Sequence, residues 1–304
     1  MKRWIAAALV CLGLVCLAQA RPGPDSNYNI SVSGGGGSYT GPGDIVAFSH
    51  WYGLRGYSAA YSTGSNPAAD LVDQAGANTI TVNILSDGTL DVASIATWVA
   101  AHSVTTIKVT KLYDQVGTNH ASQGTLATMP VLVLGPVTGL ASNRPAMVFA
   151  NAQFLATATG PNIAQPLTYS SVAIRTSGTT DVGMMAGDNG NDPEMILQAA
   201  TVASIFAGGS VVSQTQTNNA WHSFHGVFNG ASSVMNVDGT SGTSGSAGTN
   251  GLAVGHLLWI GRDSFAASGS WWVGNINEAG VISAAASGAN MTSLSSNQHS
   301  YWGY

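Results

Sequence analysis

The sequence is poor in cysteine, in basic residues and in long apolar runs, and each shortage excludes a class of protein. Cys11 and Cys16 are its two cysteines, and both lie in an N-terminal segment that we expect to be removed. The mature chain then has no disulfide and no cysteine-ligated metal. No later run reaches the roughly 18 apolar residues of a membrane-spanning helix, so we expect a soluble mature protein with no membrane partner.

The charge balance excludes a second group of partners. Nine Lys and Arg residues stand against fourteen Asp and Glu residues. Loss of Lys2 and Arg3 with the N-terminal segment leaves seven against fourteen, a net charge of −7. Without a basic cluster, nucleic acid is excluded as a partner. Abundant Gly, Ser and Thr with scattered Trp and Tyr favour neutral polar ligands, sugars above all.

The N-terminus predicts secretion and then a lead-in to one folded domain. Residues 1–20 carry two basic residues, an apolar stretch and a small-residue cleavage site, the pattern of a signal peptide. Residues 21–43 are rich in Gly and Pro and cannot bury enough apolar surface to order themselves. We expect the domain to span 44–304, a length that one β-sandwich can absorb.

Short β-branched and alternating segments separated by turns predict two packed antiparallel sheets. We expect an amphipathic helix that Asp91 caps, and a second helix within 287–304. The aromatic segment 48–57 predicts a short helix or turn packed on the sandwich, with Trp51 and Tyr52 as packing residues. The expected strands are 68–73, 78–85, 104–113, 130–134, 146–149, 167–175, 181–186, 194–199, 202–206, 221–228, 232–237, 258–261 and 272–283.

The segment 111–123, KLYDQVGTNHASQ, follows a β-branched strand and ends it in a polar turn. Turn chemistry favours a structural function for Asp114, whose carboxylate can accept backbone amides, and a hydrogen-bonded structural function for His120. The segment resembles the signature of the α-L-arabinofuranosidase B catalytic domain, of the glycoside hydrolase family 54 type. The resemblance implies a concanavalin-like jelly-roll β-sandwich with one or two peripheral helices.

Carboxylates that could hydrolyse a glycosidic bond are few. Such hydrolysis needs two carboxyl groups that face one sugar, and the chain has only two glutamates, Glu194 and Glu278. Glu194 opens a strand after a polar loop, and Asp263 ends one. Residue type alone favours a solvated strand end for Glu194 and a turn cap for Asp263.

The family resemblance changes this interpretation. Glu194, before Met-Ile-Leu, stands where the family has its nucleophile, and Asp263, in Ile-Gly-Arg-Asp, stands where it has its acid/base. The resemblance therefore implies a retaining mechanism that removes terminal α-L-arabinofuranosyl groups from plant polysaccharides, with Glu278 as a sheet residue. It implies sugar contacts from Asp192, Met184, Met185 and Gly261.

Two departures from the family leave a second function open. Met184 and Met185 stand where the family has adjacent cysteines, and the sequence has no C-terminal β-trefoil domain. The alternative is a secreted sandwich that binds or displays glycans without cleaving them. We expect no cofactor and no metal site, since no loop demands calcium, and we expect a monomer.

Overall fold

The computed structural model describes residues 39–141, 144–150, 152–177, 182–264 and 270–304. The predicted signal peptide and residues 21–38 of the lead-in lie outside these described residues. Two α-helices are described, α1 (Val92–His102) and α2 (Gly288–Trp302). In the described part of the chain, neither helix is long and apolar enough to cross a membrane.

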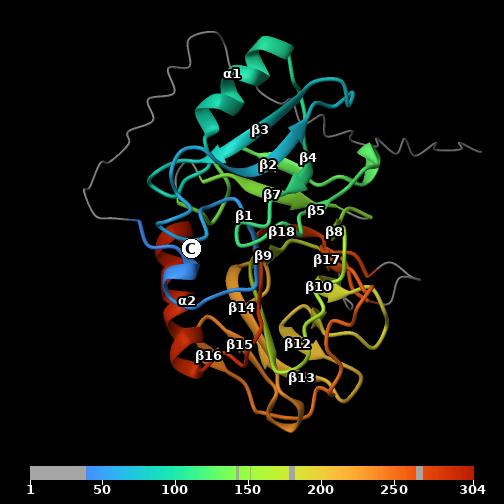
Figure 1. Cartoon of the computed structure of the whole chain (residues 1–304). Helices are drawn as coiled ribbons and strands as arrows, with labels where there is room; N and C mark the ends of the chain where they lie inside the picture. The colour runs from blue at the N-terminus through green and yellow to red at the C-terminus, as the bar shows by residue number, and fades with distance from the viewer. Residues whose placement is uncertain (1–38, 142–143, 151, 178–181, 265–269) are drawn as a thin grey trace, which may run out of the picture. The chain divides into compact units, whose positions relative to one another are not determined.

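The first sheet of the sandwich runs in the hydrogen-bonded order β1, β18, β9, β14, β15 and β16, and the second in the order β13, β12, β11, β10, β17 and β8. Every pairing is antiparallel, and β2 to β7 connect the two sheets (Figure 1). The strands of the two sheets are β1 (His50–Gly53), β8 (Leu155–Thr157), β9 (Leu167–Arg175), β10 (Val182–Gly187), β11 (Glu194–Ala199), β12 (Val202–Phe206), β13 (Val212–Thr215), β14 (Trp221–Phe228), β15 (Val234–Val237), β16 (Thr240–Ser241), β17 (Leu258–Ile260) and β18 (Gly274–Ile282). The connecting strands are β2 (Asn66–Val72), β3 (Thr79–Ile84), β4 (Ile107–Leu112), β5 (Ala121–Ser122), β6 (Val131–Val133) and β7 (Ala146–Phe149).

The predicted all-β jelly-roll sandwich is confirmed, and its core lies between the two sheets. Gly226 of β14 faces inward, because a Cβ there would stand 2.5 Å from Ile205 and 3.5 Å from the sulfur of Met195. Both contacts come from the opposite sheet, on β12 and β11. Close packing of this kind fixes which face of each strand points outward.

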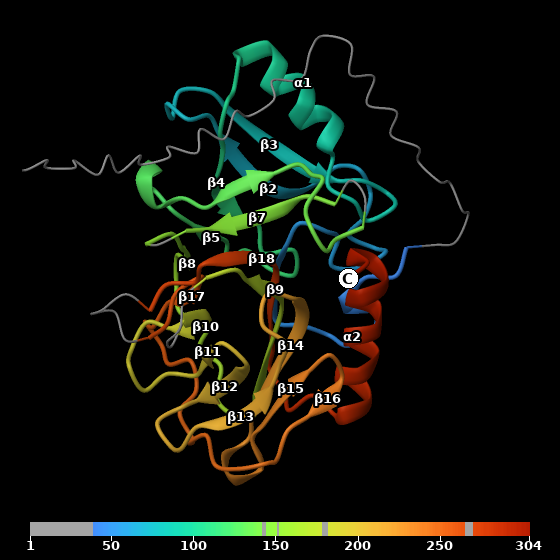
Figure 2. The ribbon, with the colours of Figure 1, turned by 180° about the vertical axis from the view of Figure 1, so that it is seen from behind.

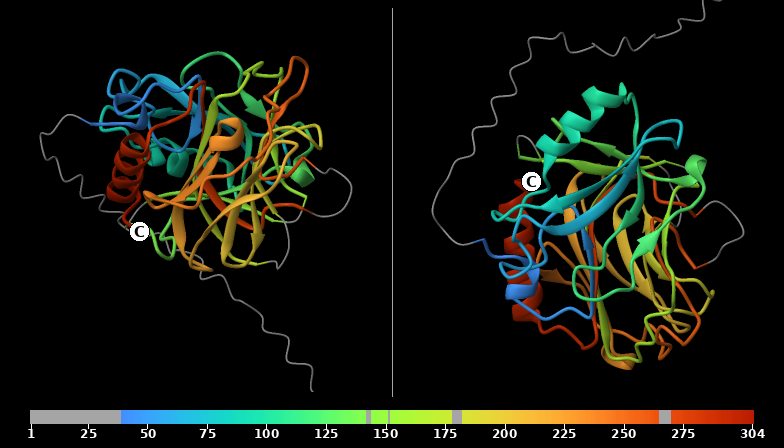
Figure 3. Two further views of the ribbon diagram at one scale, coloured as in Figure 1. Left: turned by 90° about the horizontal axis from the view of Figure 1, so that it is seen from below. Right: turned by 45° about the horizontal axis from the view of Figure 1, so that its top comes forward.

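Several strands begin and end at the predicted residues, namely 146–149, 167–175, 194–199, 202–206 and 221–228. Helix α1 begins after Asp91, whose side chain accepts from the Ser94 amide as an N-cap. Helix α2 buries Met291, Leu294 and Gln298 as its sequence predicts. Figure 2 shows α2 beside β15 and β16, and Figure 3 shows the same packing from below.

The prediction for segment 48–57 is wrong in part. Instead of a short helix or turn, its centre forms β1, which pairs with β18 from His50 opposite Val281 to Gly53 opposite Glu278. Trp51 and Tyr52 are fully buried, as expected, but they point to opposite faces of a strand. The residues that create this strand are more than 200 positions away, so tertiary pairing decides the local structure.

The signature turn is structural, as predicted. The Asp114 carboxylate accepts from the amides of Trp51 and Val116 and contacts the His50 ring at 2.7 Å. His120 accepts from the Asp114 amide. Burial raises the pKa of the Asp114 carboxyl, and the His50 hydrogen bond and these amides reverse that effect, so its pKa lies below the usual value. The turn therefore fastens β1 to β4.

Candidate functional site

Glu194 lies on the outer face of the second sheet. It stands opposite Ala186 on β10 and Phe206 on β12, and Ala186 in turn stands opposite Trp259 on β17. Residues directly opposite one another on antiparallel strands point to the same face. The neighbour Met195 faces the core, so these four side chains share the outer face.

Asp263 reaches the same face from the segment after β17. A Cβ on Gly183 of β10 would stand 2.1 Å from the Asp263 nitrogen and 2.2 Å from the Arg262 carbonyl carbon. The missing side chain of Gly183 therefore lets this segment pass directly over β10. The next residue, Ser264, donates its hydroxyl to Glu194 at 2.6 Å.

The hydrogen bond from Ser264 thus brings the segment that contains Asp263 to Glu194, although Ser264 and Glu194 are 70 positions apart in the sequence. Each is only 3% exposed. Low solvent access strengthens electrostatic interactions with a bound substrate. Two carboxyl groups that face one sugar can act as acid/base and nucleophile.

Gly261 contributes backbone geometry to this site. Its φ is +88°, and a Cβ there would stand 2.4 Å from the Phe149 ring. Its amide donates to the Met184 carbonyl oxygen, which holds the end of β17 on β10. The predicted sugar contact of Gly261 stays a prediction.

Met184 and Met185 lie in the hydrophobic core and have no exposed side-chain surface. A β-bulge between Gly183 and Met185 sends Met185 inward, opposite Ile260. Their predicted sugar contact stays a prediction, and it forms no part of the site described below.

Asp192 lies at the turn between β10 and β11 and forms a cluster that the sequence analysis missed. Both of its oxygens contact the His256 Nδ1 at 2.9 Å, and one accepts from the Asn189 amide. Ligand atoms of Asp188, Asp192 and His256 all lie within 4.8 Å of one another, so these three residues could hold a cation. No local pattern indicates this group, because His256 is 64 positions from Asp192.

Tyr169 of β9 lies beneath this turn and donates its hydroxyl to the Pro193 carbonyl oxygen at 3.2 Å. Burial, followed by the charges of Asp192 and Glu194, holds the pKa of Tyr169 well above its usual value. The phenol is therefore a fixed hydrogen-bond donor under the two carboxylates.

An aromatic cluster around Arg262 adjoins Asp263 and was also missed. The guanidinium carbon lies 3.9 Å from the ring centroid of Trp259, 4.5 Å from that of Trp271 and 5.3 Å from that of Phe154. Such cation–π contacts fix the rings. Flat aromatic surface beside two carboxylates is typical of a sugar site.

Comparison with solved structures identifies similar folds. The crystal structure of an arabinofuranosidase complexed with arabinofuranosyl-α-1,2-xylobiose matches with a TM-score of 0.63 and 16% identity. A glycoside hydrolase family 54 α-L-arabinofuranosidase soaked with a cyclic sulfate inhibitor matches with a TM-score of 0.64 and 14% identity. The chain has the fold of a family 54 α-L-arabinofuranosidase.

The expected resemblance is therefore confirmed at the level of the fold. Both alignments cover 85% of this chain but 64% of the other, so the chain spans less than two thirds of the length of these structures. No model of a known protein family matches the sequence. No curated protein matches it either.

Proposed function

We propose that this chain is a secreted glycoside hydrolase that removes terminal α-L-arabinofuranosyl groups from plant polysaccharides. The observation that supports the proposal is that the segment with Asp263 passes over β10 and that the next residue, Ser264, donates a hydrogen bond to Glu194. The fold shared with arabinofuranosidases supports the choice of sugar.

In the proposed mechanism Glu194 is the nucleophile and Asp263 the acid/base. Asp263 protonates the leaving glycosidic oxygen while Glu194 attacks the anomeric carbon. Asp263 then removes a proton from the water that releases the sugar, so the anomeric configuration is retained. This chemistry requires the two carboxyl groups to lie roughly 5–5.5 Å apart across the bound sugar.

The aromatic cluster contributes binding in this proposal. Trp259 and Trp271, held by Arg262, offer apolar faces on which a sugar ring can stack. Asp192 is proposed to accept a hydrogen bond from a sugar hydroxyl, with His256 holding its carboxylate. If turnover is absent, this same surface favours the second function, binding of glycans without cleavage.

The test is hydrolysis of 4-nitrophenyl α-L-arabinofuranoside by the mature protein and its variants. We expect Glu194→Gln to lower kcat at least about 10³-fold and Asp263→Asn to lower kcat/KM about 10²- to 10⁴-fold. Asp87→Asn is the matched control, since Asp87 is an exposed residue of the turn after β3 and is not a residue of the proposed site, and it should keep full activity.

Full activity in either site variant would contradict the proposed roles. A wild-type protein that folds but hydrolyses neither this substrate nor arabinan and arabinoxylan would contradict the enzyme proposal as a whole.

A further inference from the structure

A pocket with a volume of about 620 Å³ lies away from Glu194. Its floor is a row across three strands of the first sheet, with Trp221 opposite Ile174 and Ile174 opposite Asn275. Successive side chains on a strand point to opposite faces, and Trp221 and Gly226 are an odd number of residues apart on β14. Because Gly226 faces inward, Trp221 and the floor of the pocket face outward. The pocket and Glu194 therefore lie on opposite outer faces of the sandwich.

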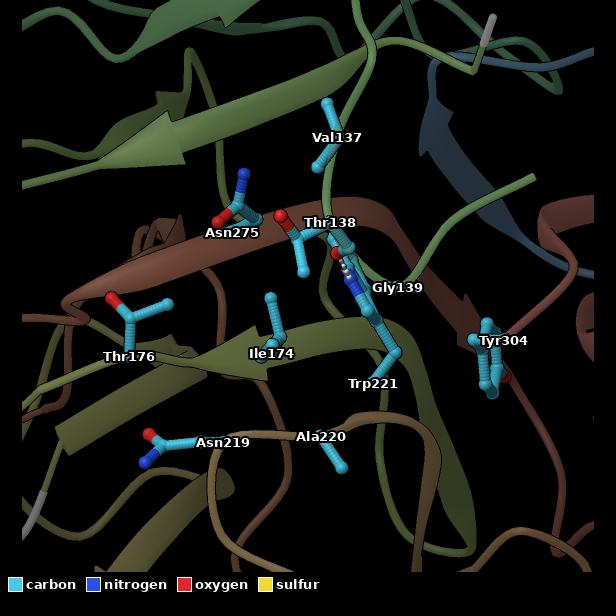
Figure 4. A pocket seen from close by; sticks show the side chains of 10 residues that line it. All are labelled: Val137, Thr138, Gly139, Ile174, Thr176, Asn219, Ala220, Trp221, Asn275 and Tyr304. Carbon is cyan, nitrogen blue, oxygen red and sulfur yellow. Dashed lines mark hydrogen bonds between the residues drawn. The ribbon is translucent and has the colours of Figure 1, made fainter. Parts of the chain in front are cut away.

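Asn275 supplies the strongest indication of a ligand. Its side chain lines the pocket and is only 8% exposed. An amide that is largely enclosed normally has hydrogen-bond partners, and a ligand in the pocket can supply them. Figure 4 shows this amide near Thr138 and Thr176, with Ile174 beside them. An asparagine amide has two donor and two acceptor positions with which it can bind a ligand on this side.

The remaining wall is rigid and apolar. The Trp221 indole nitrogen donates to the Thr138 carbonyl oxygen at 3.1 Å, which fixes the ring (Figure 4). Gly139 packs against that ring, since a Cβ there would stand 2.9 Å from it. Ile174 and Val137 extend the apolar surface.

The composition of the lining selects the class of ligand. No lining side chain is an aspartate, glutamate, lysine or arginine, so nothing in the pocket neutralises a charged ligand. Hydroxyl and amide groups from Thr138, Thr176, Asn219 and Asn275 stand around an apolar floor. A sugar ring has the matching surface, with hydroxyls at its edge and C–H groups on its faces. The volume falls within the roughly 300–1,000 Å³ of small-ligand sites.

We propose that this pocket is a second carbohydrate-binding site, which takes an uncharged sugar residue of a polysaccharide on the face opposite Glu194. The site needs no catalytic group, so it goes beyond the proposed hydrolysis. Binding at this site would keep the protein on the polysaccharide while the opposite face acts on the arabinofuranosyl branches. Such binding raises the effective concentration of the branches at that face.

The experiment is affinity electrophoresis of the full chain in native gels that contain arabinoxylan. The Glu194→Gln variant is used throughout so that the polymer is not consumed. Adding Thr176→Val and Asn275→Ala together should raise the apparent Kd for arabinoxylan about tenfold, as expected for two lost hydrogen bonds. Thr217→Val is the control, because Thr217 is exposed and lies outside the pocket, and it should leave binding unchanged.

Thr176→Trp provides a second variant in case Asn275→Ala does not fold. Position 176 is at the exposed rim, so the indole should fill the pocket without disturbing the core and should reduce the retardation to the part that is due to the Glu194 face. Arabinoxylan binding equal to that of the Glu194→Gln parent in Thr176→Trp would overturn the proposal. Tighter binding to polygalacturonate, an anionic polymer, would overturn its choice of an uncharged sugar.

Two further measurements separate this proposal from the proposed hydrolysis. When Glu194 is left unchanged, the Thr176→Trp variant should hydrolyse 4-nitrophenyl α-L-arabinofuranoside at a rate within twofold of the wild-type rate. A larger loss of activity would overturn the independence of the two sites. If wild type shows no hydrolysis but retardation still depends on Thr176, the enzyme proposal fails and the second site stands.

Discussion

A substitution at Glu278 tests most directly whether Glu278 is structural while Glu194 is catalytic. Its carboxylate is fully buried and pairs with the equally buried Arg55. It also accepts hydrogen bonds from the Gln298 amide and the Trp302 indole. Glu278→Gln keeps the shape of the side chain but removes its charge. The change leaves a guanidinium in the core and replaces one acceptor oxygen with a donor group.

The expected cost follows from these contacts. Removing one partner of a buried ion pair destabilises a protein by about 3–5 kcal/mol, because the other charge stays buried without compensation. For a domain of this size each kcal/mol lowers Tm by roughly 2–4 °C, so the variant should melt on the order of 10 °C below wild type. Arg55→Met in the same chain should recover part of the loss, since no unpaired charge then remains.

The assay compares urea unfolding and arabinofuranoside hydrolysis in the same preparations. Glu194→Gln is the matched variant, with the same chemical change at the other glutamate. We expect Glu278→Gln to lose stability and keep kcat in its folded fraction, and Glu194→Gln to lose kcat with a smaller change in stability. If Glu278→Gln unfolds within about 0.5 kcal/mol of wild type, or loses kcat while fully folded, the reasoning is refuted.

Two further predictions concern packing and pH. Gly183→Ala should destabilise the folded protein by about 1–3 kcal/mol and lower its activity, because the added Cβ would displace the backbone at Asp263. Gly124→Ala is the control, since a Cβ at Gly124 would have no atom within 4 Å. Equal effects of the two substitutions would contradict this explanation. Burial lowers the pKa of His225 from 6.5 to about 4. Between these two pH values the unfolded chain therefore binds a proton at His225 that the folded chain does not bind. Stability should then fall by about 1.4 kcal/mol per pH unit as the pH drops from 6.5 to 4. Urea unfolding of His225→Gln should show a weaker dependence, and an unchanged slope would exclude this residue as the cause.

The sequence predicted most of the long strands because their burial leaves a pattern. Strand β11 contains the apolar run Met195-Ile196-Leu197, and β9 and β14 are rich in aromatic, aliphatic and β-branched residues. Strands β5, β8 and β16 have only two or three residues and are too short for any period to appear. They exist because a neighbouring strand supplies their hydrogen bonds.

Of the groups in the candidate site, the sequence indicated the two proposed catalytic carboxylates but not the residues that position them. Glu194 and Asp263 could be selected because carboxylates are few and the surrounding motifs resemble a known family. Ser264 and Gly183 gave no comparable signal, since a serine or a glycine in a turn-rich sequence is unremarkable by itself. Their functions depend on β10 and the segment after β17 lying against each other, which local patterns do not specify.

Glu194 and Glu278 differ in the groups that surround them. Both residues are buried, so burial alone does not distinguish a catalytic carboxylate from a structural one. The difference lies in what surrounds them. Glu278 is enclosed by a guanidinium and two further donors that satisfy it within the fold. Glu194 lies on an outer face in a row with aromatic side chains and accepts a hydrogen bond from the Ser264 hydroxyl.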